Sequence, residues 1–225
     1  MTKSGKKKHL IRNIKKKLVE FNISQPQHDF LVSSALSTGF VAGLGSGKSM
    51  IASLKVILFK LKYPKIKAAY YLPTYPLIKD IAFEKFPELL EEIGIKYVLN
   101  KSDKEIKLKN FGKIIFRTMS EPETIIGYEV GYSVIDETDN LPLEKMTIAY
   151  ENITSRNRQK LPDGVLNIVD VVGTPEGYKW FYTNFKKNPL KGSILIKAST
   201  YSNLHNLPSD YIDKLSMIFP PNRLK

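Results

Sequence analysis

The residues with the clearest chemical meaning form the stretch Ala42-Gly43-Leu44-Gly45-Ser46-Gly47-Lys48-Ser49. Its glycines allow the backbone to curl so that successive N–H groups point inward and bind a polyphosphate. Lys48 would reach the β- and γ-phosphates, and the hydroxyl of Ser49 would hold Mg²⁺. The first position of such a loop is usually glycine, and here it is Ala42. The spacing predicts a site for a nucleoside triphosphate.

A second candidate for chemistry is the pair Asp136-Glu137, which follows the apolar run Tyr132-Ser133-Val134-Ile135. A strand that ends in a carboxylate places that group at the edge of the sheet where open α/β folds bind ligands. Asp136 would complete the Mg²⁺ shell together with Ser49. Glu137 would act as the general base that polarises the attacking water. The pair favours hydrolysis over transfer to an acceptor hydroxyl.

Two other segments can contribute to the same site. Thr174 lies in the turn Gly173-Thr174-Pro175 after a buried run and would face the γ-phosphate beside Asp136. It would sense whether that phosphate is present and transmit the signal to the next helix. An ordinary strand-to-helix turn is the alternative reading. Gln27 lies shortly before the phosphate loop, and its amide offers the donor and acceptor that match adenine N6 and N7. A polar helix start is the alternative there.

Arginines are few in this lysine-rich chain, so their positions are informative. Arg156 and Arg158 follow the helix expected after Asp136-Glu137, and Arg117 ends an expected hairpin strand. A guanidinium at the γ-phosphate, from the same subunit or a neighbour, would stabilise charge in the transition state. Arg156 or Arg158 is the candidate for this role; surface salt bridges or contacts to DNA phosphates are the alternatives.

The elements that must position these residues alternate between β-rich and helical runs, which is typical of an α/β fold around a mostly parallel sheet. Apolar residues at 50, 51, 54, 57, 58 and 61 predict a helix directly after the phosphate loop. Other expected helices cover 76–93, with a kink or split at Pro87, then 143–155, 178–187 and 209–217, the last with Ser209 as N-cap. Expected strands cover 68–72, 131–135, 167–172 and 193–198, and a β-hairpin joins 105–109 to 113–117. The predicted fold is a P-loop NTPase with a hairpin insertion.

Composition narrows the class of protein and of partner. The 225 residues are 42% hydrophobic and contain no cysteine, which indicates a folded protein without disulfides or thiolate metal sites. No apolar run approaches the length of a membrane span, and no signal sequence core follows the first lysines. The net charge of +13 favours a polyanionic partner, nucleic acid above all. Many of these charges fall in the first 17 residues, which form either a contact arm or a solvated leader.

Taken in order, these motifs resemble the ATPase domain of the large terminase subunit, the DNA-packaging motor of tailed bacteriophages. The resemblance covers about residues 20 to 218. The matching segments are Gln27-x-x-Phe30, the phosphate loop, Leu72-Pro73-Thr74-Tyr75, Gly127 ahead of Val134-Ile135-Asp136-Glu137, Gly173-Thr174-Pro175, and Thr200-Tyr201-Ser202-Asn203 with Leu207-Pro208-x-x-Tyr211-Ile212.

The resemblance implies that the chain hydrolyses ATP with Mg²⁺ and drives double-stranded DNA into a procapsid in the host cell cytoplasm. It further implies a portal protein and a small terminase subunit as partners, no membrane, and a homo-oligomeric ring in the active state, with the isolated domain able to be a monomer. The expected organisation is a basic arm at 1–20, the ATPase domain at 21–218, and the start of a linker at 219–225. Because the family's nuclease domain would follow residue 225, no nuclease activity is expected from this chain.

One position departs from the family pattern. Many terminases carry an arginine inside the phosphate loop where Leu44 stands here, which directs attention to Arg156 and Arg158. The alternatives are another P-loop NTPase, a helicase-like DNA motor, a small-molecule kinase, or a nucleotide-gated DNA-binding module. Phosphate release without an acceptor would exclude the kinase, and a helicase would normally need a second motor lobe.

Overall fold

The computed structural model describes residues 7–12 and 18–219. Its strands are β1 (Lys7–Arg12), β2 (Leu18–Ile23), β3 (Ser37–Ala42), β4 (Ala68–Leu72), β5 (Tyr97–Asn100), β6 (Glu105–Leu108), β7 (Gly112–Thr118), β8 (Tyr132–Ile135), β9 (Ile168–Gly173) and β10 (Ser193–Ala198). Eight of them form one sheet in the order β10-β3-β9-β8-β4-β7-β6-β5, while β1 and β2 pair antiparallel as a separate hairpin. The strands from β10 to β7 are parallel, and β6 and β5 extend the sheet antiparallel.

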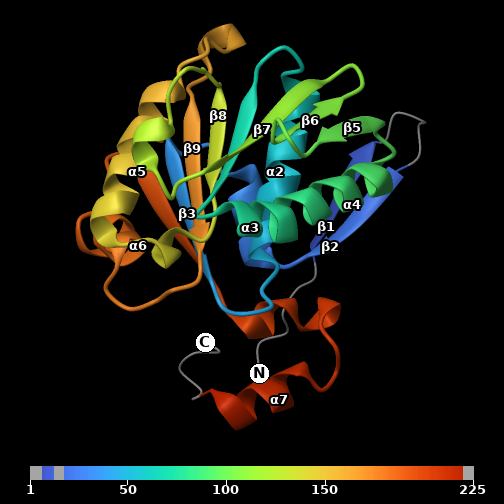
Figure 1. Cartoon of the computed structure of the whole chain (residues 1–225). Helices are drawn as coiled ribbons and strands as arrows, with labels where there is room; N and C mark the ends of the chain where they lie inside the picture. The colour runs from blue at the N-terminus through green and yellow to red at the C-terminus, as the bar shows by residue number, and fades with distance from the viewer. Residues whose placement is uncertain (1–6, 13–17, 220–225) are drawn as a thin grey trace.

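Helices cover both faces of this sheet (Figure 1). The α-helices are α1 (Gln25–Val32), α2 (Lys48–Lys62), α3 (Tyr75–Leu77), α4 (Phe83–Ile93), α5 (Leu143–Arg156), α6 (Trp180–Tyr182) and α7 (Tyr211–Ile218). Two π-helical turns, η1 (Ile78–Ala82) and η5 (Thr183–Lys187), and four 3₁₀ turns, η2 (Pro122–Thr124), η3 (Thr138–Asn140), η4 (Pro162–Gly164) and η6 (Thr200–Asn206), complete the described elements. Among the described residues, no helix combines the length and the apolar character needed to cross a bilayer.

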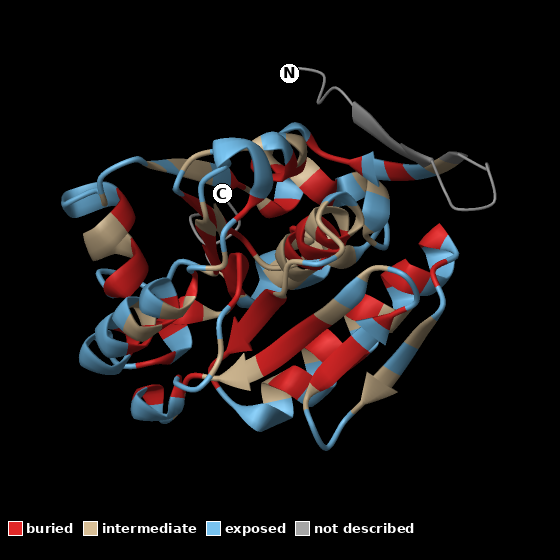
Figure 2. Cartoon of the chain, turned by 90° about the horizontal axis from the view of Figure 1, so that it is seen from above, coloured by how far each residue is buried: buried red, intermediate tan, exposed pale blue. Residues whose placement is uncertain are grey.

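The sheet separates two apolar cores. The larger core packs α1, α2 and α4 against one face and is built from residues such as Phe30, Leu54 and Phe86. The smaller core packs α5 and α6 against the other face, around Met146 and Trp180. Figure 2 shows buried residues concentrated on the strands and on the helix faces turned toward them. This three-layer arrangement leaves the strand ends free to carry polar groups, as in other α/β folds.

Most of the predicted elements are present, with two differences in the sheet. The hairpin predicted around Asn110-Phe111-Gly112 exists, but its second strand β7 also pairs parallel with β4, so it belongs to the main sheet. The short edge strand β5 was not expected from the sequence. Asn110 and Gly112 both have a positive φ, which explains why this pair of residue types forms the turn.

The helix predicted over 76–93 is interrupted at a different place from the one expected. Pro87 lies inside α4 without ending it, and the irregularity is the π-helical turn Ile78–Ala82 upstream. A proline removes the hydrogen bond to the carbonyl four residues earlier, here Phe83. Since the wider turn ends at Ala82, with Phe83 as its C-cap, the irregular backbone hydrogen bonding lies on the N-terminal side of the proline.

The predicted basic arm at 1–20 is only partly within the described residues. Residues 1–6 and 13–17 lie outside them, and β1 together with the start of β2 occupies the rest, so the arm stays a prediction. The predicted linker at 219–225 lies outside the described residues apart from Phe219. The last helix begins at Tyr211 with Asp210 at its N-cap position, rather than at Ser209.

Candidate nucleotide site

Three neighbouring parallel strands bring the predicted site together. β9 lies between β3 and β8, with Val41 opposite Gly173 and Ile135 opposite Val171. The carboxyl ends of these strands therefore place the phosphate loop, the turn Gly173-Thr174-Pro175 and Asp136-Glu137 at one edge of the sheet. This is the edge at which open α/β folds bind ligands.

The phosphate loop has the backbone geometry that its glycines allow. Gly45 and Gly47 have φ values of 70° and 74°, a region that other residues enter only with strain. Helix α2 begins at Lys48, so its unpaired N–H groups face the concave side of the loop. The Ser46 hydroxyl is buried and has no hydrogen-bond partner among the described residues. The loop thus presents donors arranged for an anion.

Lys48 and Glu137 form an ion pair across the site. Lys48 Nζ lies 2.9 Å from Glu137 Oε1, and both side chains are largely buried. Glu137 has a φ of 57° and a ψ of 44°, the left-handed region, which costs a non-glycine residue about 1–2 kcal/mol. Its backbone N–H donates to Asp136 Oδ1 at 2.8 Å, which helps to hold this conformation. The strained residue is thus the one predicted to activate water.

Asp136 is fully buried beneath this pair. Tyr70 donates its hydroxyl hydrogen to Asp136 Oδ2 at 2.7 Å. Burial, and after it the charge of Glu137, raises the pKa of Asp136 to about 6. The hydrogen bond from Tyr70, the charge of Lys48 and the hydrogen bond from the Ser49 hydroxyl oppose this shift. A carboxylate held at this energetic cost is a common property of functional sites.

The predicted magnesium ligands fit a hard cation. The Ser49 hydroxyl lies within hydrogen-bonding reach of Asp136, so a hydroxyl oxygen and a carboxylate meet at the first turn of α2. Oxygen donors of these two kinds suit Mg²⁺, which retains several waters and takes further oxygens from phosphates. The chain supplies this pair rather than a cage, because the described residues contain no cluster of three or more metal-binding side chains.

Gln27 lies beside the phosphate loop, as predicted, but its amide is already engaged. Its Nε2 donates to Ser46 O at 2.8 Å, and its Oε1 accepts from Ser24 N at 2.7 Å as part of a capping box at the start of α1. The observed contact therefore braces the loop from the α1 side. Gln27 is fully buried, and adenine recognition by it stays a prediction.

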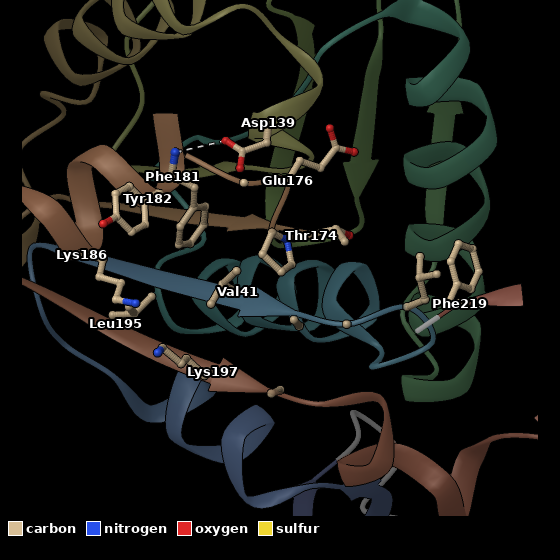
Figure 3. Close-up of a pocket in the computed structure, with 16 residues that line it drawn as sticks. Val41, Asp139, Thr174, Glu176, Phe181, Tyr182, Lys186, Leu195, Lys197 and Phe219 are labelled. Atoms are coloured by element: carbon tan, nitrogen blue, oxygen red, sulfur yellow. Dashed lines mark hydrogen bonds between the residues drawn. The ribbon is translucent and has the colours of Figure 1, made fainter. Parts of the chain in front are cut away.

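Thr174 lies at the rim of a groove of about 1010 Å³ that reaches from Leu44 in the phosphate loop to β10 (Figure 3). Next to it, the segment after Glu137 contacts the start of α6. Asp139 Oδ1 accepts from Phe181 N at 3.1 Å, and Lys179 Nζ donates to Asp139 O at 2.8 Å. Burial raises the pKa of the Asp139 carboxyl. The hydrogen bonds of Asp139 thus connect the site to α6, so the connection does not depend on Thr174 alone.

The structure corrects the expectation for Arg156 and Arg158 within one subunit. Helix α5 runs back from the site, so both residues lie at the opposite edge of the sheet, where Arg156 O accepts from Val130 N ahead of β8. Arg158 forms an exposed ion pair with Glu129 there. Neither can reach the phosphate loop of its own subunit; a role toward a neighbouring subunit stays a prediction. Arg117 lies near the carboxyl end of β7, where it donates to Phe116 O.

Two contributors to the site were given no role by the sequence reasoning. Asn203 donates from Nδ2 to Gly45 O at 2.8 Å, although the two residues are far apart in the sequence. Lys55 and Asp170 form a buried ion pair, with 2.6 Å between Nζ and Oδ2, that ties α2 to β9. An apolar helix face interrupted by Lys55 and an apolar strand interrupted by Asp170 were the available signals.

Comparisons with known proteins agree with this fold. Residues 13–169 match the family model described as DEAD/DEAH box helicase. No curated protein matches the sequence. The large terminase of a thermophilic bacteriophage superimposes with a TM-score of 0.75 at 15% identity, over 89% of this chain and 51% of that one. This chain therefore spans about half the length of that terminase.

Shorter solved structures align over most of their own length. The ATPase domain of the Thermus phage P74-26 large terminase aligns over 89% of this chain and 90% of its own, with 15% identity and a TM-score of 0.66. The N-terminal domain of the DNA packaging ATPase from bacteriophage phi29 aligns over 76% of this chain and 93% of its own. Its identity is 12% and its TM-score is 0.56.

At these identities the alignments establish a shared fold, which is the P-loop fold of terminase ATPase domains. The family match, by contrast, covers well over half of the sequence and includes both the phosphate loop and Asp136-Glu137. The chain belongs to the DEAD/DEAH box helicase family.

Proposed function

We propose that this chain is the ATPase domain of a large terminase subunit, which hydrolyses ATP to move double-stranded DNA into a viral procapsid. The observation that carries the proposal is the Lys48–Glu137 pair above the buried Asp136, at the mouth of the phosphate loop. ADP and ATP-γ-S are bound by the thermophilic-phage terminase whose fold this chain shares.

The phosphate loop would bind the triphosphate through its N–H groups and Lys48. When Lys48 moves to the β- and γ-phosphates, it leaves Glu137 without its cation, because both groups now share one ion pair. The carboxylate of Glu137 is then free to accept a hydrogen bond from a water molecule. Nucleotide binding would thus free Glu137 to act as the base. Before the nucleotide binds, the ion pair with Lys48 keeps Glu137 inactive.

Hydrolysis requires the water oxygen to attack the γ-phosphorus in line with the bond to the leaving β-phosphate oxygen. Glu137 would accept the proton from that water, the bond to the β-phosphate oxygen would break, and ADP and inorganic phosphate would leave. Mg²⁺ bound by Ser49 and Asp136 would neutralise charge on the β- and γ-phosphates. Tyr70 keeps the Asp136 carboxylate oriented toward Ser49 throughout.

Release of the γ-phosphate would change the position of Glu137 and of the residues that follow it. Thr138 packs against Gly173, where a Cβ would lie only 2.9 Å from the Thr138 hydroxyl oxygen, and Asp139 is hydrogen-bonded to Phe181. A shift of η3 would therefore move both the Gly173-Thr174-Pro175 turn and α6. This is how hydrolysis would be coupled to movement of the domain, with Thr174 as part of the moving turn.

The grip on DNA would be independent of sequence, because an excess of lysines binds backbone phosphates. The motor would act in the host cell cytoplasm as a ring of copies, with a portal protein and a small terminase subunit as partners. In such a ring Arg156 or Arg158 of one copy would approach the γ-phosphate of the next. Gln27, beside the loop, would read the adenine.

Glu137→Gln tests the proposal. The amide keeps the size of the side chain but cannot accept the proton, so phosphate release from ATP and Mg²⁺ should fall about a hundredfold or more while ATP-γ-S binding remains. Glu144→Gln, an exposed position in the first turn of α5, is the matched control and should leave the rate unchanged. Turnover that survives in Glu137→Gln would remove Glu137 from the mechanism. The assay contains no acceptor, so absence of phosphate release by the wild-type chain would favour a kinase.

The family match favours a helicase-like motor as the second candidate. The two motors differ in what they do to a duplex. A packaging motor displaces a third strand from a DNA triplex without separating the underlying duplex, whereas a helicase releases one strand of a partly single-stranded substrate. Both reactions can be followed by gel mobility of labelled strands with ATP and Mg²⁺. Strand release without triplex displacement would favour the helicase.

A further inference from the structure

The segment that follows β10 begins next to the phosphate loop. β10 pairs parallel with β3, with Ala198 opposite Ala42, and Gly43 N donates to Ala198 O at 3.0 Å. The 3₁₀ helix Thr200–Asn206 follows β10, and helix α7 comes after it. Figure 1 shows the first part of this segment, in red, beside the end of α2 at which that helix begins, with α7 farther from the sheet. Residues far apart in the sequence thus become neighbours of the loop.

Asn203 makes the central contact. It is 4% exposed and donates from Nδ2 to Gly45 O at 2.8 Å. Its Oδ1 accepts from Asn206 Nδ2 at 3.0 Å, and Asn206 also donates to Asn22 O at 3.0 Å. These partners fix the direction of the Asn203 amide, because reversing it would turn an oxygen toward the Gly45 carbonyl. The side chain is therefore held in place to donate to the loop.

Gln27 and Asn203 hold successive carbonyls of the loop from two sides. Gln27 binds Ser46 O and Asn203 binds Gly45 O. A Cβ built on Gly47 would lie 2.5 Å from Gln27 Nε2 and 3.4 Å from Asn203 Nδ2, so both amides converge on one place behind the loop. In a trans peptide the C=O and the following N–H point in opposite directions. Fixing the Ser46 carbonyl outward therefore turns the N–H of Gly47 toward the concave side, while the N–H of Ser46 donates to Gly43 O at 3.3 Å and closes the turn.

Two more contacts extend this support along the loop. A Cβ on Gly43 would lie 2.7 Å from Thr200 Oγ1, so the buried threonine hydroxyl lies against the first glycine. A Cβ on Gly45 would lie 2.9 Å from Cε1 of Tyr211, so that ring covers the outer side of the loop. One continuous segment thus contacts Gly43 and Gly45 at three points.

We propose that residues 200–211 are a clasp that positions the phosphate loop for nucleotide, with Asn203 as the positioning residue; this rests on the proposed function. Asn203 does not touch the nucleotide in this account. It acts through the Gly45 carbonyl and so fixes the peptide unit whose N–H, on Ser46, closes the loop onto Gly43 O. Since the clasp leads into α7, nucleotide affinity and the position of that helix are linked.

Asn203→Asp is the sharpest test, because it preserves shape but replaces the donor by a carboxylate facing a carbonyl. We expect ATP-γ-S to bind roughly tenfold more weakly in calorimetric titration, corresponding to about 1.4 kcal/mol. In steady-state hydrolysis KM should rise by a similar factor while kcat stays within about twofold, since the loop binds ground and transition states alike. Asn152→Asp is the matched control: its Nδ2 also donates to a backbone carbonyl, Pro122 O at 2.9 Å, but it lies on α5 outside the clasp, so both constants should stay unchanged.

Asn206→Ala serves if Asn203→Asp fails to fold. Asn206 is exposed, and its removal takes away the partner of Asn203 Oδ1 together with the hydrogen bond to Asn22 O, so a twofold to threefold loss of ATP-γ-S affinity is expected. Lys48→Ala separates this inference from the proposed function. If Lys48→Ala weakens binding and neither asparagine variant does, the clasp is wrong and the nucleotide site stands. If Lys48→Ala binds ATP-γ-S normally, the nucleotide site itself is wrong.

Discussion

At the scale of single residues, the site depends on backbone conformations that few side chains tolerate. Gly45 and Gly47 have a positive φ within the phosphate loop, and Glu137 adopts the same region without being glycine. In each case the neighbours compensate: Gln27 and Asn203 bind the loop carbonyls, and Asp136 accepts the Glu137 N–H. The strain is therefore located where the proposed chemistry takes place.

Gly47→Ala should reduce both stability and nucleotide binding. Its φ of 74° is strained for alanine, and the added methyl would meet Gln27 Nε2 at 2.5 Å. We expect a loss of about 2 kcal/mol or more in urea unfolding and at least tenfold weaker ATP-γ-S binding. Gly164→Ala is the control, because φ is 69° there and nothing lies within 4 Å. Equal effects of the two variants on binding would contradict the packing of Gln27 against the loop.

The sequence predicted the residues whose roles depend on local spacing. Lys48 and Ser49 follow the glycines directly, and Asp136-Glu137 ends an apolar run, so each motif carries its own context. Asn203 could not be assigned in this way, because its contact with Gly45 depends on β10 pairing with β3. Arg156 and Arg158 are close to Glu137 in the sequence, but α5 runs back along the sheet. Within one subunit both arginines therefore lie at the opposite edge from Glu137.

At the scale of elements, buried polar contacts fix α2 and β9 relative to each other. Lys55 on α2 pairs with Asp170 on β9, and that carboxylate also accepts from Tyr132 OH at 2.7 Å and from Thr38 N at 3.0 Å. The strands β3, β8 and β9 and the helix after the phosphate loop therefore meet at one buried charge. These contacts explain why an acidic residue is tolerated inside the apolar strand β9.

Lys55→Met should be strongly destabilising, because it leaves the Asp170 carboxylate buried without a cation. We expect a loss of about 3 kcal/mol in urea unfolding, and a partial recovery when Asp170→Asn is added. The double variant keeps the acceptor for Thr38 N and removes the charge. A cost of Lys55→Met below about 1 kcal/mol, or no coupling between the two substitutions, would show that the pair does not hold α2 on β9.

The antiparallel end of the sheet gives a pH-dependent prediction. Glu105 on β6 accepts from Lys113 Nζ at 2.6 Å, and this hydrogen bond and the lysine charges lower the pKa of the carboxyl. Because the folded pKa is depressed, the stabilisation is present above the pKa of the unfolded carboxyl, near about 4.3, and is lost as the pH falls through the folded value. Glu105→Gln should therefore destabilise by about 1 kcal/mol at about pH 7 and by less at about pH 3 in urea unfolding. A constant difference across this range would contradict the lysine contacts.

At the scale of the whole molecule, the net charge and the sheet topology each bear on the proposed function. The net charge of +13 favours binding to nucleic acid in general, whereas the order of the strands collects the proposed hydrolytic residues at one edge. Terminase ATPase domains share this fold at low identity. These chains share a topology although most of their side chains differ. Function must therefore be inferred from the residues of the site and not from the overall sequence.

Double-stranded DNA should bind with little sequence preference and strong dependence on salt. Each lysine or arginine that contacts a phosphate releases counterions, so the logarithm of affinity should fall steeply with the logarithm of salt concentration. Fluorescence anisotropy with two duplexes of unrelated sequence measures both properties. Affinities within about threefold of each other are expected at each salt concentration. A strong preference for one duplex would indicate base readout rather than a backbone grip.

The central claim is that ATP takes Lys48 away from Glu137 and so creates the hydrolytic site. A crystal structure of the chain with Mg²⁺ and a non-hydrolysable ATP analogue tests it most directly. The present separation of 2.9 Å between Lys48 Nζ and Glu137 Oε1 should lengthen beyond hydrogen-bonding distance, with Lys48 on the β- and γ-phosphates and Glu137 facing the γ-phosphate through a water. An intact Lys48–Glu137 pair with the analogue bound in the phosphate loop would contradict the account.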